Sequence, residues 1–252
     1  MLKAPKFWYQ SNFSILAILL LPLSLIWITG TYLKKKFAKP IRSKIPVIAI
    51  GSAIIGGSGK TPSVIYVCEI LEKIGYKPHV ISRGYGGSAN EVIKVSPEMS
   101  YSVVGDEAIM MSKYYPTWVS KNKYNAFAMA EKDGANILVL DDALQSYNIF
   151  KNLNIYVYDS IQSFGNKLIV PSGPLRESIS SVLNRSQIVF LVNTDNCPEI
   201  SKNKFQQNIN YEISIKPEMR DKRLMPFAGL GFNKKFFDQL YNEGLDITLT
   251  KE

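Results

Sequence analysis

The sequence predicts an α/β fold in which a mainly parallel sheet is flanked by helices. Short apolar segments typical of buried strands alternate along the chain with segments whose apolar residues recur at helical spacing. The clearest strand is Pro46–Ile50, because a glycine-rich loop and a helix follow it directly. Strands that alternate with helices normally form a parallel sheet. Further strands are predicted at His79–Ser82, Asn154–Asp159, Gln187–Asn193 and Tyr211–Ile215.

The composition of the 252-residue chain excludes several classes of protein. With 46% hydrophobic residues the chain can build a sizeable core, and disorder is not expected. Its 30 basic and 21 acidic residues give a net charge of +9, which favours an anionic lipid or a phosphorylated substrate as partner. No nucleic-acid-binding motif accompanies this charge, so we expect no nucleic acid. Cys68 and Cys197 show no metal-binding spacing, and a reducing compartment is expected.

A phosphate-binding loop is predicted between the first strand and the helix that follows it. Glycines there let backbone N–H groups approach phosphate oxygens, and the helix N-terminus adds positive potential. Lys60 can reach the β- and γ-phosphates, and the Thr61 hydroxyl can ligate Mg²⁺. We therefore expect a P-loop NTPase-type sheet with ATP and Mg²⁺ as cofactors; the alternative is a glycine-rich turn without a ligand. The predicted cofactor-binding residues are Gly56, Gly57, Ser58, Gly59, Lys60 and Thr61.

An acidic pair follows the second clear strand, Asn136–Leu140. Asp141 and Asp142 come directly after this strand, at the edge of a parallel sheet where the phosphate loop also lies. Carboxylates at this position suit the ligation of Mg²⁺. An aspartate after a strand can also cap the next helix, so one of the two can cap while the other serves the metal.

The N-terminal region contains no charged residue from Phe13 to Leu33. As one helix these 21 residues would be about 30 Å long, the thickness of a bilayer core. Six basic residues follow within the next eleven positions, which places the rest of the chain at the cytoplasmic face of the inner membrane. A helix that lies in the membrane interface is the main alternative, since Pro22 interrupts the segment, and a cleaved signal peptide is a third interpretation.

The predicted organisation has three parts. Residues 1–33 form the membrane-associated helix, and residues 34–150 form the nucleotide-binding and catalytic lobe. Residues 151–252 form a second, smaller α/β lobe that we expect to be incomplete. The boundary between the two lobes is placed near Phe150.

Several separated segments resemble the tetraacyldisaccharide 4'-kinase family of the lipid A pathway. Their order and spacing hold across nearly all of the chain, and the apolar N-terminus agrees as well. The matching segments are Gly56–Pro62 (GGTGKTP in the family), Ser82–Gly87 (SRGYGG), Gly105–Glu107 (GDE), Asp141–Gln145 (DDGLQ), Phe164–Asn166 (FGN), Gly173–Glu177 (GPLRE) and Ala228–Gly231 with Phe236 and Phe237.

This resemblance implies a reaction and roles for individual residues. ATP would phosphorylate the 4'-hydroxyl of an acylated glucosamine disaccharide 1-phosphate, with membrane lipid as a further partner and no protein partner implied. Asp106 would be catalytic, together with Lys60 and Asp142, and Asp141, Asp142 and Thr61 would hold Mg²⁺. Alone, the Gly-Asp-Glu motif can equally be a solvated turn. The implied substrate-binding residues are Arg83, Tyr85, Glu107, Gln145, Arg176 and Glu177.

The chain departs from the family pattern at several positions. Lys123 stands where arginine is expected, which keeps the charge but loses the bidentate geometry. Ser52, Ile54, Ala143 and Ser146 replace the usual asparagine, threonine, glycine and histidine. An Asp-His-His segment of the family, in which one histidine would assist the catalytic aspartate, is expected beyond Glu252, so the copy looks truncated. The only histidine, His79, precedes a strand and is interpreted as structural.

Two other functions are weighed against the kinase. A GTPase or metallochaperone-type ATPase would need an Asn-Lys-x-Asp motif, and Asn193-Thr194-Asp195 lacks the lysine. A degenerate nucleotide binder at the membrane would bind ATP without transferring its phosphate, because the C-terminal segment is missing. Phosphoryl transfer to a lipid separates this alternative from the kinase.

Overall fold

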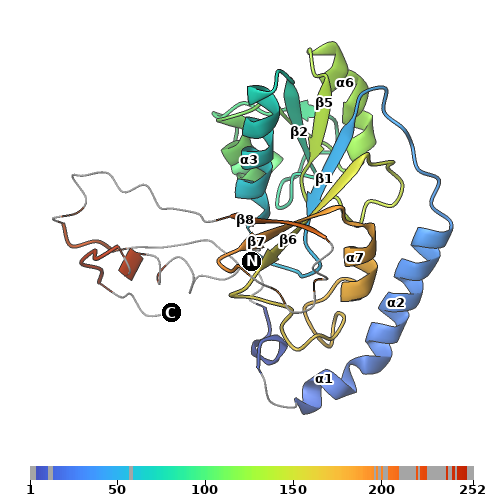
Figure 1. Ribbon diagram of the computed structural model, residues 1–252, viewed down its shortest axis with the longest axis vertical. Helices are drawn as coiled ribbons and strands as arrows, with labels where there is room; N and C mark the ends of the chain where they lie inside the picture. Colours follow the sequence, from blue (N-terminus) through green and yellow to red (C-terminus); the bar gives the residue numbers. More distant parts are fainter. Residues whose placement is uncertain are drawn as a thin grey trace.

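The structure is a computed structural model, and it describes residues 4–10, 14–56, 59–195, 197, 200, 204–209, 220, 222–225, 237, 240–241 and 243–248. Strands and helices alternate through most of this part of the chain (Figure 1). The strands are β1 (Val47–Gly51), β2 (Pro78–Ser82), β3 (Ile93–Lys94), β4 (Thr117–Val119), β5 (Ile137–Leu140), β6 (Leu153–Asp159), β7 (Ile188–Val192) and β8 (Phe205–Ile209). The helices are η1 (Lys6–Trp8), α1 (Ile15–Leu19), α2 (Leu21–Lys36), α3 (Lys60–Lys73), α4 (Tyr101–Val104), α5 (Asp106–Ser112), η2 (Lys123–Ala126), α6 (Phe127–Lys132) and α7 (Ile179–Arg185).

The described strands form one sheet in the order β3-β4-β2-β5-β1-β6-β7-β8. Neighbouring strands are parallel except for the short edge strand β3, which runs antiparallel to β4. Strand β1 lies inside the sheet between β5 and β6, in register Val47↔Leu138 and Ile48↔Leu153. The predicted α/β fold with a mainly parallel sheet is therefore confirmed.

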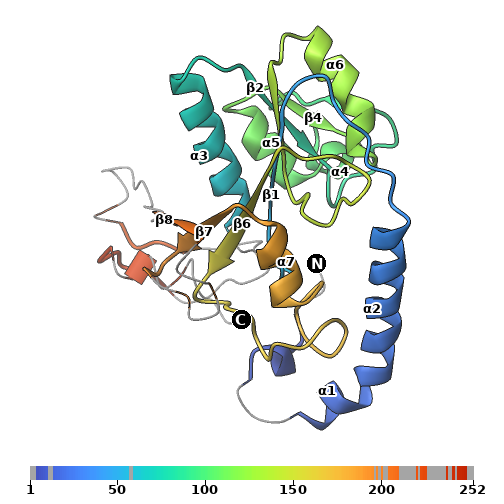
Figure 2. The ribbon, with the colours of Figure 1, turned by 45° about the vertical axis from the view of Figure 1, so that its right-hand side comes forward.

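Helices cover both faces of this sheet. Side chains alternate across β1, so Val47 and Ala49 pack toward α6 and α7, whereas Ile48 and Ile50 pack against α3. Because both faces are covered, the central strands contain almost only apolar residues, which is why they were recognisable in the sequence. Figures 1 and 2 show α3 on one side of the sheet and α7 on the other, with α2 running along the outside.

The N-terminal segment differs from the single long helix that the sequence predicted. Helix α1 ends at Leu19 and α2 begins at Leu21, because Pro22 has no N–H group to continue the hydrogen bonding. With 16 residues, α2 is about 24 Å long, shorter than a bilayer core. Among the described residues, no helix is both long and apolar enough to cross a membrane.

The predicted boundary near Phe150 falls between β5 and β6. Both of these strands pair with β1, so residues before and after the boundary belong to one sheet. The strands that follow the boundary, β6 to β8, therefore continue the same sheet and do not form a second one. The predicted strand Tyr211–Ile215 lies outside the described residues, and so do Ala228–Gly231.

Candidate active site

The phosphate loop leaves β1 at Gly51 and reaches α3 at Lys60. Gly59 caps the helix in the left-handed region, with φ of 73°, where glycine is favoured. Lys60 and Thr61 are buried in the first turn, and Lys60 Nζ donates a hydrogen bond to the carbonyl of Gly56 at 3.0 Å. The loop thus places an ammonium group and a hydroxyl at the helix N-terminus. Gly57 and Ser58 lie outside the described residues.

Asp141 and Asp142 follow β5, which is the strand beside β1 in the sheet. Asp141 is buried and accepts a hydrogen bond from Ser82 Oγ at 3.0 Å through one carboxylate oxygen. Its other oxygen, Oδ1, is also buried and has no partner in the part of the chain that the structure describes. Asp142 turns the chain with a φ of 46°, a conformation that aspartate tolerates better than most residues. The pair therefore presents a carboxylate oxygen that a cation could satisfy.

Cations surround this acidic pair. Lys123 is buried, and its Nζ lies 3.4 Å from the carbonyl oxygen of Asp142. Burial acts to raise the pKa of Asp142, but Lys60, Arg176 and Lys123 outweigh it and hold that pKa at about 2. Burial raises the pKa of Asp141, and the neighbouring charge of Asp142 adds to this effect. Asp142 is thus firmly ionised.

Arg176 ties the acidic pair to a second polar group. Its Nη1 lies 2.9 and 2.8 Å from the two carboxylate oxygens of Asp142, and 3.4 Å from Oε1 of Gln145. Gln145 donates from Nε2 to the carbonyl of Ser52 at 3.1 Å and to Glu177 at 2.9 Å. The predicted residues Arg176, Gln145 and Glu177 are therefore brought together beside Asp142 and the start of the phosphate loop.

Glu177 is buried, and protein donors engage both of its oxygens. Arg185 contacts the two oxygens, and Ser181 Oγ donates to one of them at 3.0 Å. Burial acts to raise the pKa of Glu177, but the hydrogen bonds and charge of Arg185 keep that pKa below its usual value. This arrangement favours a role in positioning Gln145 over the predicted contact with substrate.

The predicted catalytic residue Asp106 begins α5, where Gly105 brings two loops together. A Cβ atom on Gly105 would lie 2.5 Å from the carbonyl oxygen of Tyr85, so only glycine allows this approach. Arg83, Tyr85 and Asp106 are exposed, and one carboxylate oxygen of Asp106 accepts a hydrogen bond from the N–H of Glu107 at 2.9 Å. The two loops thus present one arginine and two carboxylates to solvent at the open side of the site.

Glu107 lies within electrostatic reach of the phosphate loop and of the acidic pair. Glu107 is exposed as a residue, but the surrounding protein partly desolvates its carboxylate. This desolvation raises the pKa of Glu107 to about 7. Asp141 and Asp142 act in the same direction, whereas Lys60 opposes them. A bound cation or an additional lysine contact would therefore favour the ionised form of Glu107.

Comparison with known proteins identifies the family. Residues 16–252 match the family described as tetraacyldisaccharide-1-P 4'-kinase. The chain belongs to this family. A tetraacyldisaccharide 4'-kinase of Jannaschia sp. is 33% identical over 263 residues, with 99% of this chain and 78% of the relative covered. The enzyme of Gluconobacter oxydans is also 33% identical, with coverages of 96% and 76%. The predicted family, and with it the predicted kinase class, is confirmed.

A solved structure of the same family has the same fold. LpxK from Aquifex aeolicus, crystallised in complex with ATP, superposes with a TM-score of 0.80 at 24% sequence identity. The match covers 93% of this chain and 80% of that chain. At this identity the likeness shows the fold, whereas the individual site residues of this 4'-kinase family member stay predictions.

Three residues of this family member at the same end of the sheet were not among the predicted site residues. Ser82 donates a hydrogen bond to Asp141 and lies in the matching segment Ser82–Gly87, whereas Lys123, which contacts Asp142, had been noted as a departure from the family pattern. Gln162 is buried, and its Oε1 has no hydrogen-bond partner among the described residues; a Cβ atom on Gly56 would lie 3.6 Å from the Gln162 amide. Nothing in the sequence singled out Gln162, because its neighbour in the fold lies about 100 residues earlier.

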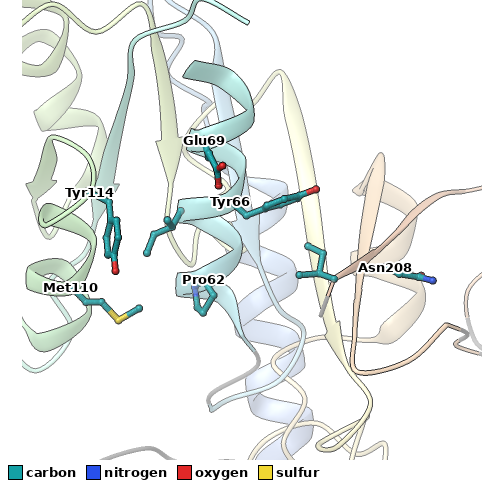
Figure 3. Close-up of a pocket in the computed structure, with 8 residues that line it drawn as sticks. Pro62, Tyr66, Glu69, Met110, Tyr114 and Asn208 are labelled. Carbon is teal, nitrogen blue, oxygen red and sulfur yellow. The ribbon is translucent and has the colours of Figure 1, made fainter. Parts of the chain in front are cut away.

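A shallow groove of about 470 Å³ lies on the outer face of α3, away from the acidic pair (Figure 3). Pro62, Tyr66 and Glu69 of α3 form its floor, with Met110 and Tyr114 on one side and Asn208 on the other. It contains none of the charged groups that phosphoryl transfer requires. Lys60, Asp141 and Asp142 are not among the residues that line this groove.

Proposed function

We propose that this chain transfers the γ-phosphoryl group of ATP to the 4'-hydroxyl of a tetraacylated glucosamine disaccharide 1-phosphate. One observation carries the proposal: a buried lysine at a helix N-terminus and a buried aspartate with an unpartnered oxygen meet at the carboxyl ends of β1 and β5. This is the arrangement that phosphate and a hard cation require. The family membership supplies the substrate class.

The residues present fit Mg²⁺. The unpartnered Oδ1 of Asp141 and the hydroxyl of Thr61 are oxygen donors of the type that Mg²⁺ prefers. Among the described residues there is no group of three carboxylate, histidine or cysteine ligands. Mg²⁺ is commonly bound by one or two carboxylates together with the phosphates of the substrate. When bound, Mg²⁺ would neutralise charge on the β- and γ-phosphates. Asp141, Asp142 and Thr61 would hold it.

The chain's own residues would supply the remaining chemistry. Lys60 binds the phosphates and stabilises the charge that develops as the γ-phosphorus leaves the β–γ bridging oxygen. The sugar oxygen forms the new bond to phosphorus, ADP departs, and the hydroxyl proton passes to the carboxylate of Asp106. Asp106 is exposed at the start of α5 and can reach a substrate hydroxyl from solvent. Arg83 and Tyr85 line the same open side and are available to the anionic substrate.

We place this activity at a lipid surface, on the cytoplasmic face of the inner membrane. Support comes from α1 and α2, whose large apolar side chains are mostly exposed, among them Leu19, Leu25 and Ile26. Lys34, Lys35 and Lys36 end α2, where they can meet anionic lipid headgroups. Apolar residues beside a cluster of lysines are typical of a helix that lies in the membrane interface.

The test compares lipid phosphorylation with ATP binding in the purified chain. Wild type should convert a tetraacyldisaccharide 1-phosphate to the 1,4'-bisphosphate, and Asp106→Asn should lower kcat about 10²- to 10⁴-fold because general-base assistance is lost. Calorimetry should show nearly equal ATP affinity in both proteins. ATP binding by wild type without any lipid phosphorylation would instead support the degenerate nucleotide binder.

A further inference from the structure

Helix α2 contacts the rest of the protein largely through polar groups. Ser24 is its buried residue, whereas most of the surrounding side chains are exposed. The Ser24 hydroxyl donates to the carbonyl of Ile169 at 2.8 Å and accepts from the N–H of Ser172 at 3.2 Å. Ser24 thus attaches α2 to one particular segment, residues 169–176.

Trp27 makes the second attachment, one helical turn after Ser24. Its indole Nε1 donates to the main-chain carbonyl of Arg176 at 2.9 Å, while about half of the side chain stays exposed (47%). Tryptophan is suited to a membrane interface because it combines an apolar ring with one polar N–H group. Here the polar group points at the active-site segment instead of at lipid or water.

Residues 169–176 are joined to the phosphate loop by main-chain hydrogen bonds. The N–H of Ile55 donates to the carbonyl of Pro174 at 2.9 Å, and the N–H of Arg176 donates to the carbonyl of Ala53 at 2.8 Å. Arg176 is thereby held at three points: its N–H by Ala53, its carbonyl by Trp27, and its guanidinium by Asp142. One of these three points lies on the helix that carries the exposed apolar residues.

We propose that Trp27 is a positioning residue that couples the contact of α2 with a lipid surface to the placement of Arg176 against Asp142. The inference rests on the proposed function, because it requires a lipid surface as the ligand of α2. A helix held by lipid gives the Trp27 indole a fixed position, and this favours the arrangement of 169–176 that the hydrogen bond requires. By reciprocity, an ordered site favours the same position of α2 on the lipid. The kinase would therefore be most active where its lipid substrate resides.

Hydrogen exchange of the full chain tests this coupling without relying on catalysis. Exchange is measured with and without vesicles made of equal parts phosphatidylglycerol and phosphatidylethanolamine. In wild type, vesicles should slow exchange both in α2 and in residues 168–177, the latter about three- to tenfold, as expected for stabilising one hydrogen-bonded contact. Trp27→Phe keeps an aromatic ring but has no N–H group, so vesicles should slow exchange in α2 alone.

Tyr32→Phe is the matched control. Tyr32 is exposed on the same helix, and its substitution also removes one polar hydrogen from an aromatic side chain. This variant should retain the response of 168–177. An equal response of 168–177 in wild type and Trp27→Phe, or no response in wild type, would overturn the coupling.

Lipid kinase assays on the same three proteins give a second readout. Trp27→Phe should lower kcat about three- to tenfold with the KM for ATP unchanged, and in an Arg176→Ala background it should have no further effect. A fall in kcat of the same size in the Arg176→Ala background would show that Trp27 does not act through Arg176. If wild type lacks lipid kinase activity while its exchange pattern still responds through Trp27, the proposed function fails and the coupling stands.

Discussion

A single nitrogen of Arg176, Nη1, lies within 2.9 Å of both carboxylate oxygens of Asp142. The side chains of this pair are 22% and 30% exposed, so the contact is only partly screened by water. Both carboxylate oxygens of Asp142 therefore contact the guanidinium of Arg176, and rotation of the carboxylate would break this contact. Asp141, with one oxygen unpartnered, is left as the more available ligand for a metal.

Arg176→Met should lower kcat about 10- to 100-fold. The variant removes a hydrogen bond between charged groups, which typically contributes about 1.5–3 kcal/mol, and it frees Asp142 to rotate. ATP affinity, measured by calorimetry, should change much less because Lys60 and the phosphate loop remain. A loss of ATP binding equal to the loss of kcat would show that Arg176 binds the nucleotide instead of orienting Asp142.

Lys60→Ala should reduce turnover at least about 100-fold, since a phosphate clamp in the transition state is typically worth a few kcal/mol. Lys73→Ala is the control: Lys73 ends the same helix and pairs with Glu69 on the exposed surface. Turnover of the control should stay within about twofold of wild type. Near-normal turnover of Lys60→Ala in steady-state assays would remove the phosphate-loop assignment.

Arg185→Met should destabilise the fold by about 3 kcal/mol. Glu177 is 5% exposed at its side chain, and the variant would leave its charge buried without its cation. Urea denaturation should show a lower midpoint with an unchanged m-value. Arg185→Lys, which keeps the charge, should lose less; an equal loss in both variants would mean that packing on Tyr147, whose ring lies 5.4 Å from the guanidinium, dominates.

The contribution of His79 to the stability of the fold should decline as the pH falls from 7.5 to 5.5. This histidine is buried, and its Nδ1 accepts a hydrogen bond from Trp118 Nε1 at 3.2 Å, so the neutral form is required. Burial lowers the pKa of His79 and outweighs the opposing effect of Asp133. The unfolded chain therefore binds the proton first, and stability is lost as the pH falls through the unfolded pKa of about 6.5.

His79→Asn is the comparison for this pH dependence, because its Oδ1 can accept the same indole hydrogen bond. Denaturation of both proteins across this pH range gives the slope of the free energy of unfolding against pH for each. The difference between the two slopes is the contribution of His79, the only histidine of the chain. Glu107 titrates in the same range with the opposite sign, since its pKa is raised in the folded state, but it contributes equally to both slopes. Identical slopes would show that His79 keeps an ordinary pKa.

Replacement of Lys34, Lys35 and Lys36 by Gln should weaken binding to anionic vesicles about 100-fold. Each lysine near an anionic surface contributes about 1 kcal/mol, and the three residues are exposed at the end of α2. The apolar residues and the contacts of Ser24 and Trp27 remain, so binding to uncharged vesicles should be unaltered. Unchanged sedimentation with anionic vesicles would place the lipid contact elsewhere on the protein.

The central part of the fold was predictable because its signals are local. Strand β1, the glycine loop and α3 follow one another in the sequence, and the predicted and observed bounds of β1 differ by one residue. Buried parallel strands are continuous apolar runs, which is why β2, β6 and β7 were also located correctly. The edge strand β3 has two residues and lacks such a run, so it was missed.

The contacts that position the site were not predictable in the same way. The hydrogen bond from Trp27 to Arg176 joins residues 149 positions apart, and an apolar N-terminal helix gives no sign of its partner. The family motif predicted that Glu177 binds substrate. A sequence motif identifies a residue but does not show which way its side chain points. Its burial against Arg185 depends on α7, whose packing the sequence pattern does not specify.

The central position of β1 has a consequence for how the chain is made. Its two neighbours, β5 and β6, begin about 90 and 105 residues later, so a ribosome has released the phosphate loop long before either side of its strand can be paired. At typical synthesis rates of about 5–20 residues per second, the apolar run Val47–Gly51 waits for roughly 5–20 s with both edges open. The acidic pair that follows β5 can therefore join the phosphate loop only after the chain has been made as far as Asp142.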